Sequence, residues 1–237
     1  MHPMSQPVCL ITGAGDGTGA AIARRFTAGG YRVALLARTG DRLRRLENEI
    51  AGSRGYVCDV GNLDHLKAAI ANATSDLGPP RVAVHNAVMG EFKPPLEADP
   101  ALFEKMFRVN VTALMVMAQC VVPRMIETAG GALVVTGNTA AWRGKPNFSM
   151  FAPTKAAQRI LAQSMARDFG PKGVHVAYLT IDAAIDTPWT RDRIFPGKPD
   201  DFFCKPAAIA DEVYHVAHQD RSAWSFDIEV RPDRESW

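Results

Sequence analysis

The stretch Thr12-Gly13-Ala14-Gly15-Asp16-Gly17-Thr18-Gly19 decides the fold of this 237-residue chain. It follows a short apolar run at residues 8–12 and precedes residues 20–26, where apolar side chains recur at helical spacing. Glycines permit a tight turn and close backbone approach, and the start of a helix offers free amides and a positive dipole end to a phosphate. A strand, a glycine-rich turn and a helix in this order predict a dinucleotide-binding unit.

The alternation of strand and helix continues along the chain. Strands are predicted at residues 31–37, 55–60, 82–86, 133–136, 174–181 and 226–230, and helices at residues 41–50, 63–73, 102–127 and 154–169. Apolar strands of this kind are typical of a sheet that helices cover on both faces. The sequence therefore predicts the α/β class: a doubly wound parallel sheet in a Rossmann-type single domain.

We expect this single NAD(P)-binding domain to span residues 1–237. Residues 1–7 are expected to form a flexible tail. In residues 186–206 proline recurs and interrupts any long element, which favours a flap over a ligand.

Composition narrows the classes of function. The chain has 27 basic and 25 acidic residues, a net charge of +2, which gives no field suited to nucleic acid. Its four cysteines lie far apart, so neither a metal site nor a redox motif is expected, and buried, reduced thiols are favoured. Residues 1–7 lack the apolar core of a signal peptide, and we expect no apolar run long enough to span a bilayer. We expect a cytoplasmic protein without a membrane partner.

The spacing T-G-x-x-x-G-x-G resembles the fingerprint of the short-chain dehydrogenase/reductase family, and the resemblance extends over nearly the whole chain. It implies that Asp59 and Val60 hold the adenine. It also implies that Asn86 and Ala87 line the cofactor, although Val88 replaces the glycine of the family's N-N-A-G. The remaining cofactor-binding residues implied are the loop residues Gly13, Gly15, Asp16, Gly17, Thr18 and Gly19, together with Lys155 and, beside the nicotinamide, Ile185 and Thr187.

Cofactor choice depends on Arg38, which ends the second predicted strand. An NAD site commonly places an acid there to bind the ribose diol, whereas an arginine can pair with the 2′-phosphate of NADP. Asp16 opposes this preference, because NADP-binding relatives often carry a basic residue in that part of the loop. The sequence favours NADP and leaves NAD possible.

The resemblance breaks at the catalytic residues. The family uses a Ser to polarise the substrate, a Tyr to pass the proton, a Lys four residues later, and an Asn that supports the Lys through water. Asn110 and Lys155 match the Asn and the Lys, but Phe151 stands at the Tyr position and has no exchangeable proton. Asn138 stands at the Ser position, where its amide can still donate to a substrate oxygen.

Three functions remain open at this point. The first is an NADP(H)-dependent oxidoreductase that moves hydride to or from a carbonyl, an alcohol or a conjugated double bond, with a proton donor other than tyrosine. The second is a catalytically silent NADP(H)-binding sensor or inactive subunit, and the third a non-redox isomerase or lyase. The F-A-x-x-K motif and residues 225–232 resemble an atypical branch of bacterial family members with poorly defined activities.

The resemblance also implies partners. Relatives pair through the two long helices, here residues 102–127 and 154–169, so a homodimer or homotetramer is expected. Aromatic side chains in the flap favour a small apolar or aromatic substrate, or alternatively anchor the flap itself. The sequence does not identify the substrate or the direction of the reaction.

Overall fold

The central sheet is entirely parallel. The computed structural model describes residues 6–128 and 130–234. The sheet contains β1 (Val8–Thr12), β2 (Arg32–Ala37), β3 (Ser53–Val57), β4 (Pro80–His85), β5 (Gly131–Gly137), β6 (Val174–Ile181) and β9 (Asp227–Val230). Its order, β3-β2-β1-β4-β5-β6-β9, reverses direction between β1 and β4. In such sheets ligands bind at the carboxyl ends of the strands beside this reversal.

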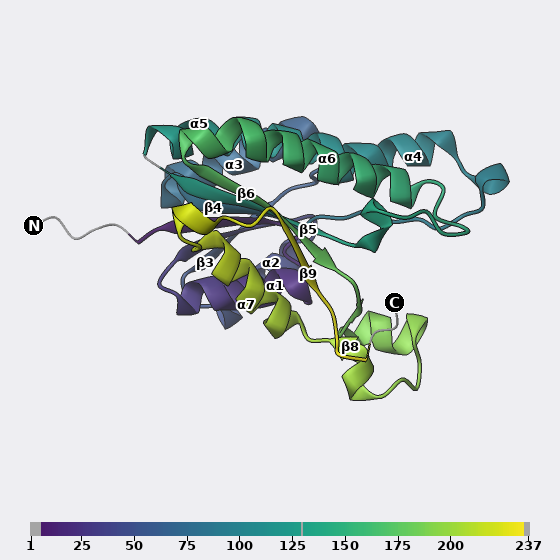
Figure 1. The fold of residues 1–237 in the computed structure, drawn as a ribbon. Helices are drawn as coiled ribbons and strands as arrows, with labels where there is room; N and C mark the ends of the chain where they lie inside the picture. Colours follow the sequence, from purple (N-terminus) through teal and green to yellow (C-terminus); the bar gives the residue numbers. More distant parts are fainter. Residues whose placement is uncertain (1–5, 129, 235–237) are drawn as a thin grey trace, which may run out of the picture.

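Helices cover both faces of the sheet (Figure 1). One layer holds α1 (Thr18–Ala28), α2 (Gly40–Glu49) and α7 (Pro206–Ala217); the other holds α3 (Leu63–Leu77), α4 (Pro100–Phe107), α5 (Ala113–Glu127) and α6 (Phe151–Phe169). Each layer buries its own apolar cluster against the strands. The predicted doubly wound parallel sheet is therefore confirmed.

Two helical regions differ from the prediction. The single helix expected at residues 102–127 is α4, a π turn η2 (Arg108–Thr112), and α5. Contrary to the expectation from the sequence, this run is apolar and long enough to cross a membrane, but 56% of its apolar window is buried inside the fold, as in a core helix. Helix α7 was not predicted, although Pro206 at its first turn and the buried Ile209, Val213 and Val216 carry a helical signal.

The carboxyl ends of the strands carry the irregular segments. Strands β7 (Ala184–Ile185) and β8 (Phe203–Cys204) pair and close the base of the proposed flap, which projects from the body of the molecule around β8 (Figure 1). The other short elements are η1 (Pro95–Glu97), η3 (Thr139–Ala141), η4 (Gly170–Lys172), η5 (Thr190–Ile194), η6 (Asp200–Phe202) and η7 (Arg221–Ala223). Of the expected tail, residues 1–5 lie outside the described residues, and the Pro7 carbonyl accepts a hydrogen bond from the Arg32 amide.

Candidate active site

The glycine loop between β1 and α1 approaches neighbouring backbone more closely than a side chain would permit. Gly13 has φ +72°, and a Cβ there would lie 2.6 Å from the Ala87 backbone. A Cβ on Gly19 would lie 2.5 Å from the Gly13 carbonyl oxygen. Helix α1 has no side-chain cap at its N-terminus, and the Thr18 and Gly19 amides donate to no described residue, whereas the Ala20 amide donates to the Gly15 carbonyl at 2.9 Å. This geometry fits a pyrophosphate at the helix start.

A cavity of about 350 Å³ opens beside this loop. It runs past Arg38 at the end of β2 and Arg42 in α2, and then past Asp59 and Val60 after β3. The remaining lining residues are Gly13, Gly15, Gly17, Thr18, Gly19, Leu36, Ala37, Cys58, Asn86, Ala87, Val88, Met89, Val109 and Ile185. Most of the sequence-predicted cofactor residues therefore meet around one cavity.

Asp16 lies differently from the expectation. Its carboxylate forms ion pairs with Arg45 and, at 3.4 Å, with Arg42, and it is absent from the cavity lining. Because two arginines neutralise it, Asp16 does not present an unpaired negative charge to a phosphate. Arg42, which the sequence analysis did not assign to the site, lines the cavity together with Arg38; its place at the start of the helix that follows Arg38 was the available signal.

Asn86 and Asp59 are held by backbone contacts. The Asn86 amide nitrogen donates to the Gly13 carbonyl at 2.9 Å, which ties the end of β4 to the glycine loop. One Asp59 carboxylate oxygen accepts from the Gly61 amide at 2.9 Å. The other oxygen makes no hydrogen bond with a described residue and remains available to a ligand. Thr187 borders the loop from the opposite side, because a Cβ on Gly17 would lie 2.8 Å from its methyl group.

Phe151 is a buried aromatic residue. Its ring centroid lies 5.2 Å from that of Phe92 and 6.1 Å from that of Phe148, both in edge-on geometry. It belongs to a third apolar cluster at the carboxyl end of the sheet and is absent from the cofactor cavity lining. The position is therefore occupied by a packing group that carries no proton to exchange.

Asn138 begins the short η3 turn after β5. Its side-chain oxygen accepts from the Ala140 amide at 3.2 Å. Its amide nitrogen donates to no described residue, and Asn138 is absent from the lining of the cofactor cavity. Next to it, the Thr139 hydroxyl donates to Asp182 at 3.2 Å, and Arg143 lies 3.7 Å from the same carboxylate.

Lys155 points into the protein. It is 2 % exposed, and its ammonium donates to the Thr136 carbonyl at 3.3 Å and to the Gln158 side chain. Burial lowers the pKa of Lys155 from 10.5 to about 7. Asn110, in the π turn, donates through its side chain to Thr154 and to the Met89 carbonyl, both at 2.9 Å.

Similarity to known proteins agrees with this geometry. The short chain dehydrogenase family model matches residues 7–193. The chain belongs to the short-chain dehydrogenase family.

Individual relatives of this family differ in how much of the chain they match. "Dehydrogenase/reductase SDR family member 4" from Sus scrofa is 29% identical over 73% of this chain, and the match spans only 64% of that protein. A short-chain dehydrogenase structure from Rhodopseudomonas palustris is 33% identical, with TM-score 0.82, covering 97% of this chain and 100% of that one. An alcohol dehydrogenase from Thermococcus sibiricus, complexed with 5-hydroxy-NADP, is 27% identical with TM-score 0.87, covering 97% and 98%.

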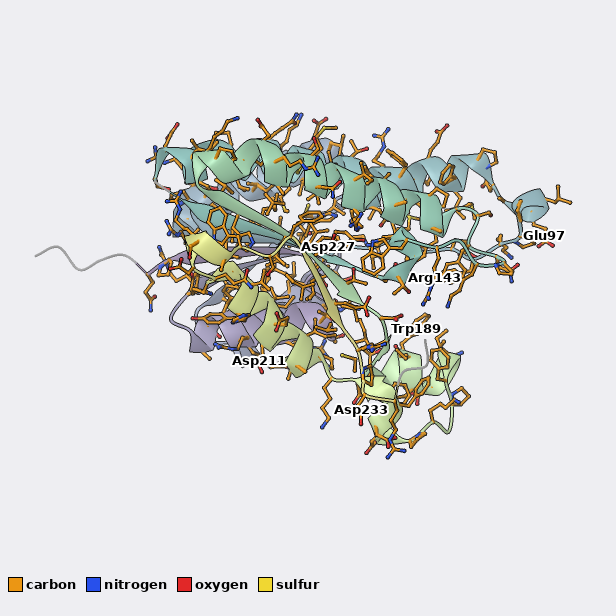
Figure 2. The ribbon with its side chains drawn as sticks, in the orientation of Figure 1. Glu97, Arg143, Trp189, Asp211, Asp227 and Asp233 are labelled. Carbon is orange, nitrogen blue, oxygen red and sulfur yellow. The ribbon has the colours of Figure 1, made fainter. Side chains whose placement is uncertain are left out.

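A second cavity lies beside the turn that follows β5. Its volume is about 390 Å³, and the segment from η3 to the start of α6 lines most of it, including Trp142, Arg143 and Phe148. Figure 2 places Arg143 opposite Trp189 of the flap. The ring of Phe202 contacts the rings of Phe195 and Phe203, so these three residues anchor the flap. Trp189, by contrast, is 64% exposed.

Proposed function

We propose that this chain is an NADP(H)-dependent oxidoreductase that transfers hydride to or from a carbonyl or alcohol group of a small molecule. The glycine loop with the uncapped Thr18 and Gly19 amides, joined to a cavity that Arg38 and Arg42 border, is the observation that carries the proposal. Two guanidinium groups at the ribose end suit a 2′-phosphate, which they can bind in bidentate fashion. The relative complexed with 5-hydroxy-NADP supports this choice of cofactor.

The residues divide into a binding set and a reaction set. The loop from Gly13 to Gly19 would hold the pyrophosphate, Asp59 and Val60 the adenine, and Ile185 and Thr187 the nicotinamide end. When bound, the nicotinamide supplies or accepts the hydride. The Asn138 amide donates to the substrate oxygen and stabilises negative charge that develops there.

The proton donor in this proposal is not a tyrosine side chain. A positioned general acid is worth about two to four orders of magnitude in rate, so slow turnover is expected even without one. Lys155, Thr139 and a water molecule held by Asn138 are the candidates among the described residues. From the F-A-x-x-K arrangement we propose that the chain belongs to an atypical branch of its family.

An alternative function is a silent NADP(H) sensor or inactive subunit. Phe151 favours it, because the ring is packed among apolar side chains and blocks the usual proton route.

We further propose a cytoplasmic homodimer or homotetramer with a single functional domain, in which residues 186–206 cover the substrate. Four free cysteines support a reducing compartment.

A titration separates the two functions. Purified protein is titrated with NADPH and with NADH by fluorescence, and then mixed with a panel of ketones and alcohols while nicotinamide absorbance is followed, with Phe151→Tyr tested in parallel. We expect NADPH to bind more tightly than NADH and the wild type to turn over slowly. Binding without wild-type turnover, with activity gained in Phe151→Tyr, would favour the silent function; no binding of either nucleotide would contradict both.

A further inference from the structure

Gln158 connects two residues of the site through the protein interior. It is fully buried in α6, one helical turn after Lys155. Its amide oxygen accepts from the Lys155 ammonium, and its amide nitrogen donates to the Asn110 backbone carbonyl at 2.6 Å. A buried glutamine is costly unless both ends of its amide are paired, and here both are.

The π turn provides the acceptor for this connection. Residues 108–112 form η2, in which the Ala113 amide donates to the Arg108 carbonyl five residues earlier. A π turn inserts an extra residue into a helix and changes which carbonyls find a partner within it, often at functional sites. The Asn110 carbonyl thereby receives a side-chain donor from α6. The resemblance to the family implies water between Lys and Asn, whereas in this chain Gln158 makes the link directly.

We propose that Gln158 is a positioning residue that holds the Lys155 ammonium between the Thr136 carbonyl and the Asn110 backbone, so that its remaining N–H is directed to the nicotinamide ribose. An ammonium has three donors, and two are used by Thr136 and Gln158. The third has no acceptor among the described residues. This inference rests on the proposed function for its ribose partner but not for the Gln158 contact.

Among the residues that the structure describes, no acid forms an ion pair with Lys155. The charged or titratable group that faces it is His85 of β4, which burial keeps neutral by lowering its pKa to about 3. The packed groups from β5, η2 and α6 are Thr136, Asn110 and Gln158, which do not ionise. The charge on Lys155 therefore depends on the hydrogen bonds that its ammonium donates to two uncharged acceptors, and Gln158 is one of the two.

Two substitutions at this position test the proposal with opposite signs. Gln158→Leu removes the acceptor, so the titration midpoint of Lys155 falls below its wild-type value near 7. Gln158→Glu places a carboxylate beside the ammonium, so the midpoint rises. The midpoint is measured in the protein without nucleotide from the ¹³Cε NMR shift of Lys155, assigned with Lys155→Met. Gln163→Leu, a half-buried glutamine on the same helix, is the control and should leave the midpoint unchanged.

Nucleotide affinity provides the second measurement. At pH 7.5 we expect Gln158→Leu to weaken NADPH binding about tenfold, the size typical for losing a hydrogen bond to a charged group. We expect the Gln158→Glu variant to retain its affinity for NADPH up to a higher pH than wild type does. If both folded variants leave the Lys155 midpoint unchanged, the positioning role is wrong. If the midpoints shift as expected but wild type binds neither nucleotide, the proposed function and the ribose contact fail while the Gln158 contact stands.

Discussion

Single residues at the ends of the strands decide which nucleotide this site can hold. Arg38 is exposed at the end of β2 and forms no ion pair with a described residue, whereas Arg42 is shared with Asp16. Arg38 is therefore the guanidinium that a 2′-phosphate can bind without displacing an existing partner. Asp16 repels the phosphate of NADP less than the sequence suggested, because Arg42 and Arg45 already neutralise its carboxylate.

We predict that Arg38→Ala weakens NADPH binding about tenfold or more and changes NADH binding little. The reason is that a charge-assisted hydrogen bond to phosphate is worth about 1.5–3 kcal/mol, and only NADPH offers that phosphate. Fluorescence titration with both nucleotides measures the ratio of the two affinities. Arg44→Ala is the control, because Arg44 is exposed on α2 and pairs with Asp41. An equal loss for both nucleotides would show that Arg38 does not read the 2′-phosphate.

The sequence predicted the residues of this site better than their orientation. The glycine loop, Asp59, Val60 and Asn86 meet at one cavity because parallel strands bring their carboxyl ends to one edge, which motif order alone implies. The inward direction of Lys155 was not predictable. It depends on Gln158, and a glutamine at that spacing on a helix could equally face solvent.

At the scale of elements, strand positions were predictable because apolar runs between turn signals mark them, and β6 matches the predicted bounds at both ends. The division of residues 102–127 into α4, the π turn and α5 was not, since the side-chain periodicity continues through it. The flap shows the same limit. Its prolines indicate irregular backbone, but the pairing of β7 with β8 joins residues far apart in sequence.

The outer faces of α4, α5 and α6 carry exposed apolar side chains that an interface would cover. Phe107, Met115 and Ile160 are 40%, 41% and 57% exposed. We predict that Ile160→Asp lowers the solution mass from a dimer or tetramer to a smaller species, because a buried carboxylate in an apolar interface is costly. Light scattering measures the mass, with Val57→Asp, on the edge strand β3, as the control. An unchanged mass for Ile160→Asp would argue against this interface.

At the scale of the whole molecule, buried bases make stability depend on pH. His85 is fully buried in β4, with Nδ1 3.2 Å from the Thr12 hydroxyl, and Nε2 has no hydrogen-bond partner among the described residues. Burial lowers its pKa from 6.5 to about 3. Between these two values the unfolded chain binds a proton that the folded chain does not. The free energy of unfolding therefore falls as pH drops from 6.5 towards 3, and the contribution of His85 is fully present above pH 6.5.

We predict that His85→Asn removes much of this acid sensitivity. Between pH 7 and pH 5 wild type should lose about 2 kcal/mol more of its unfolding free energy than the variant, since each pH unit inside the window is worth about 1.4 kcal/mol. Lys155, with a pKa of about 7, titrates at the top of this range in both proteins, so its contribution cancels in the difference. Urea denaturation at the two pH values measures it, and His65→Asn, an exposed histidine on α3, should behave as wild type. Equal losses in wild type and His85→Asn would mean that the folded protein accommodates a charged His85, and the β4 end of the site would then be open to water.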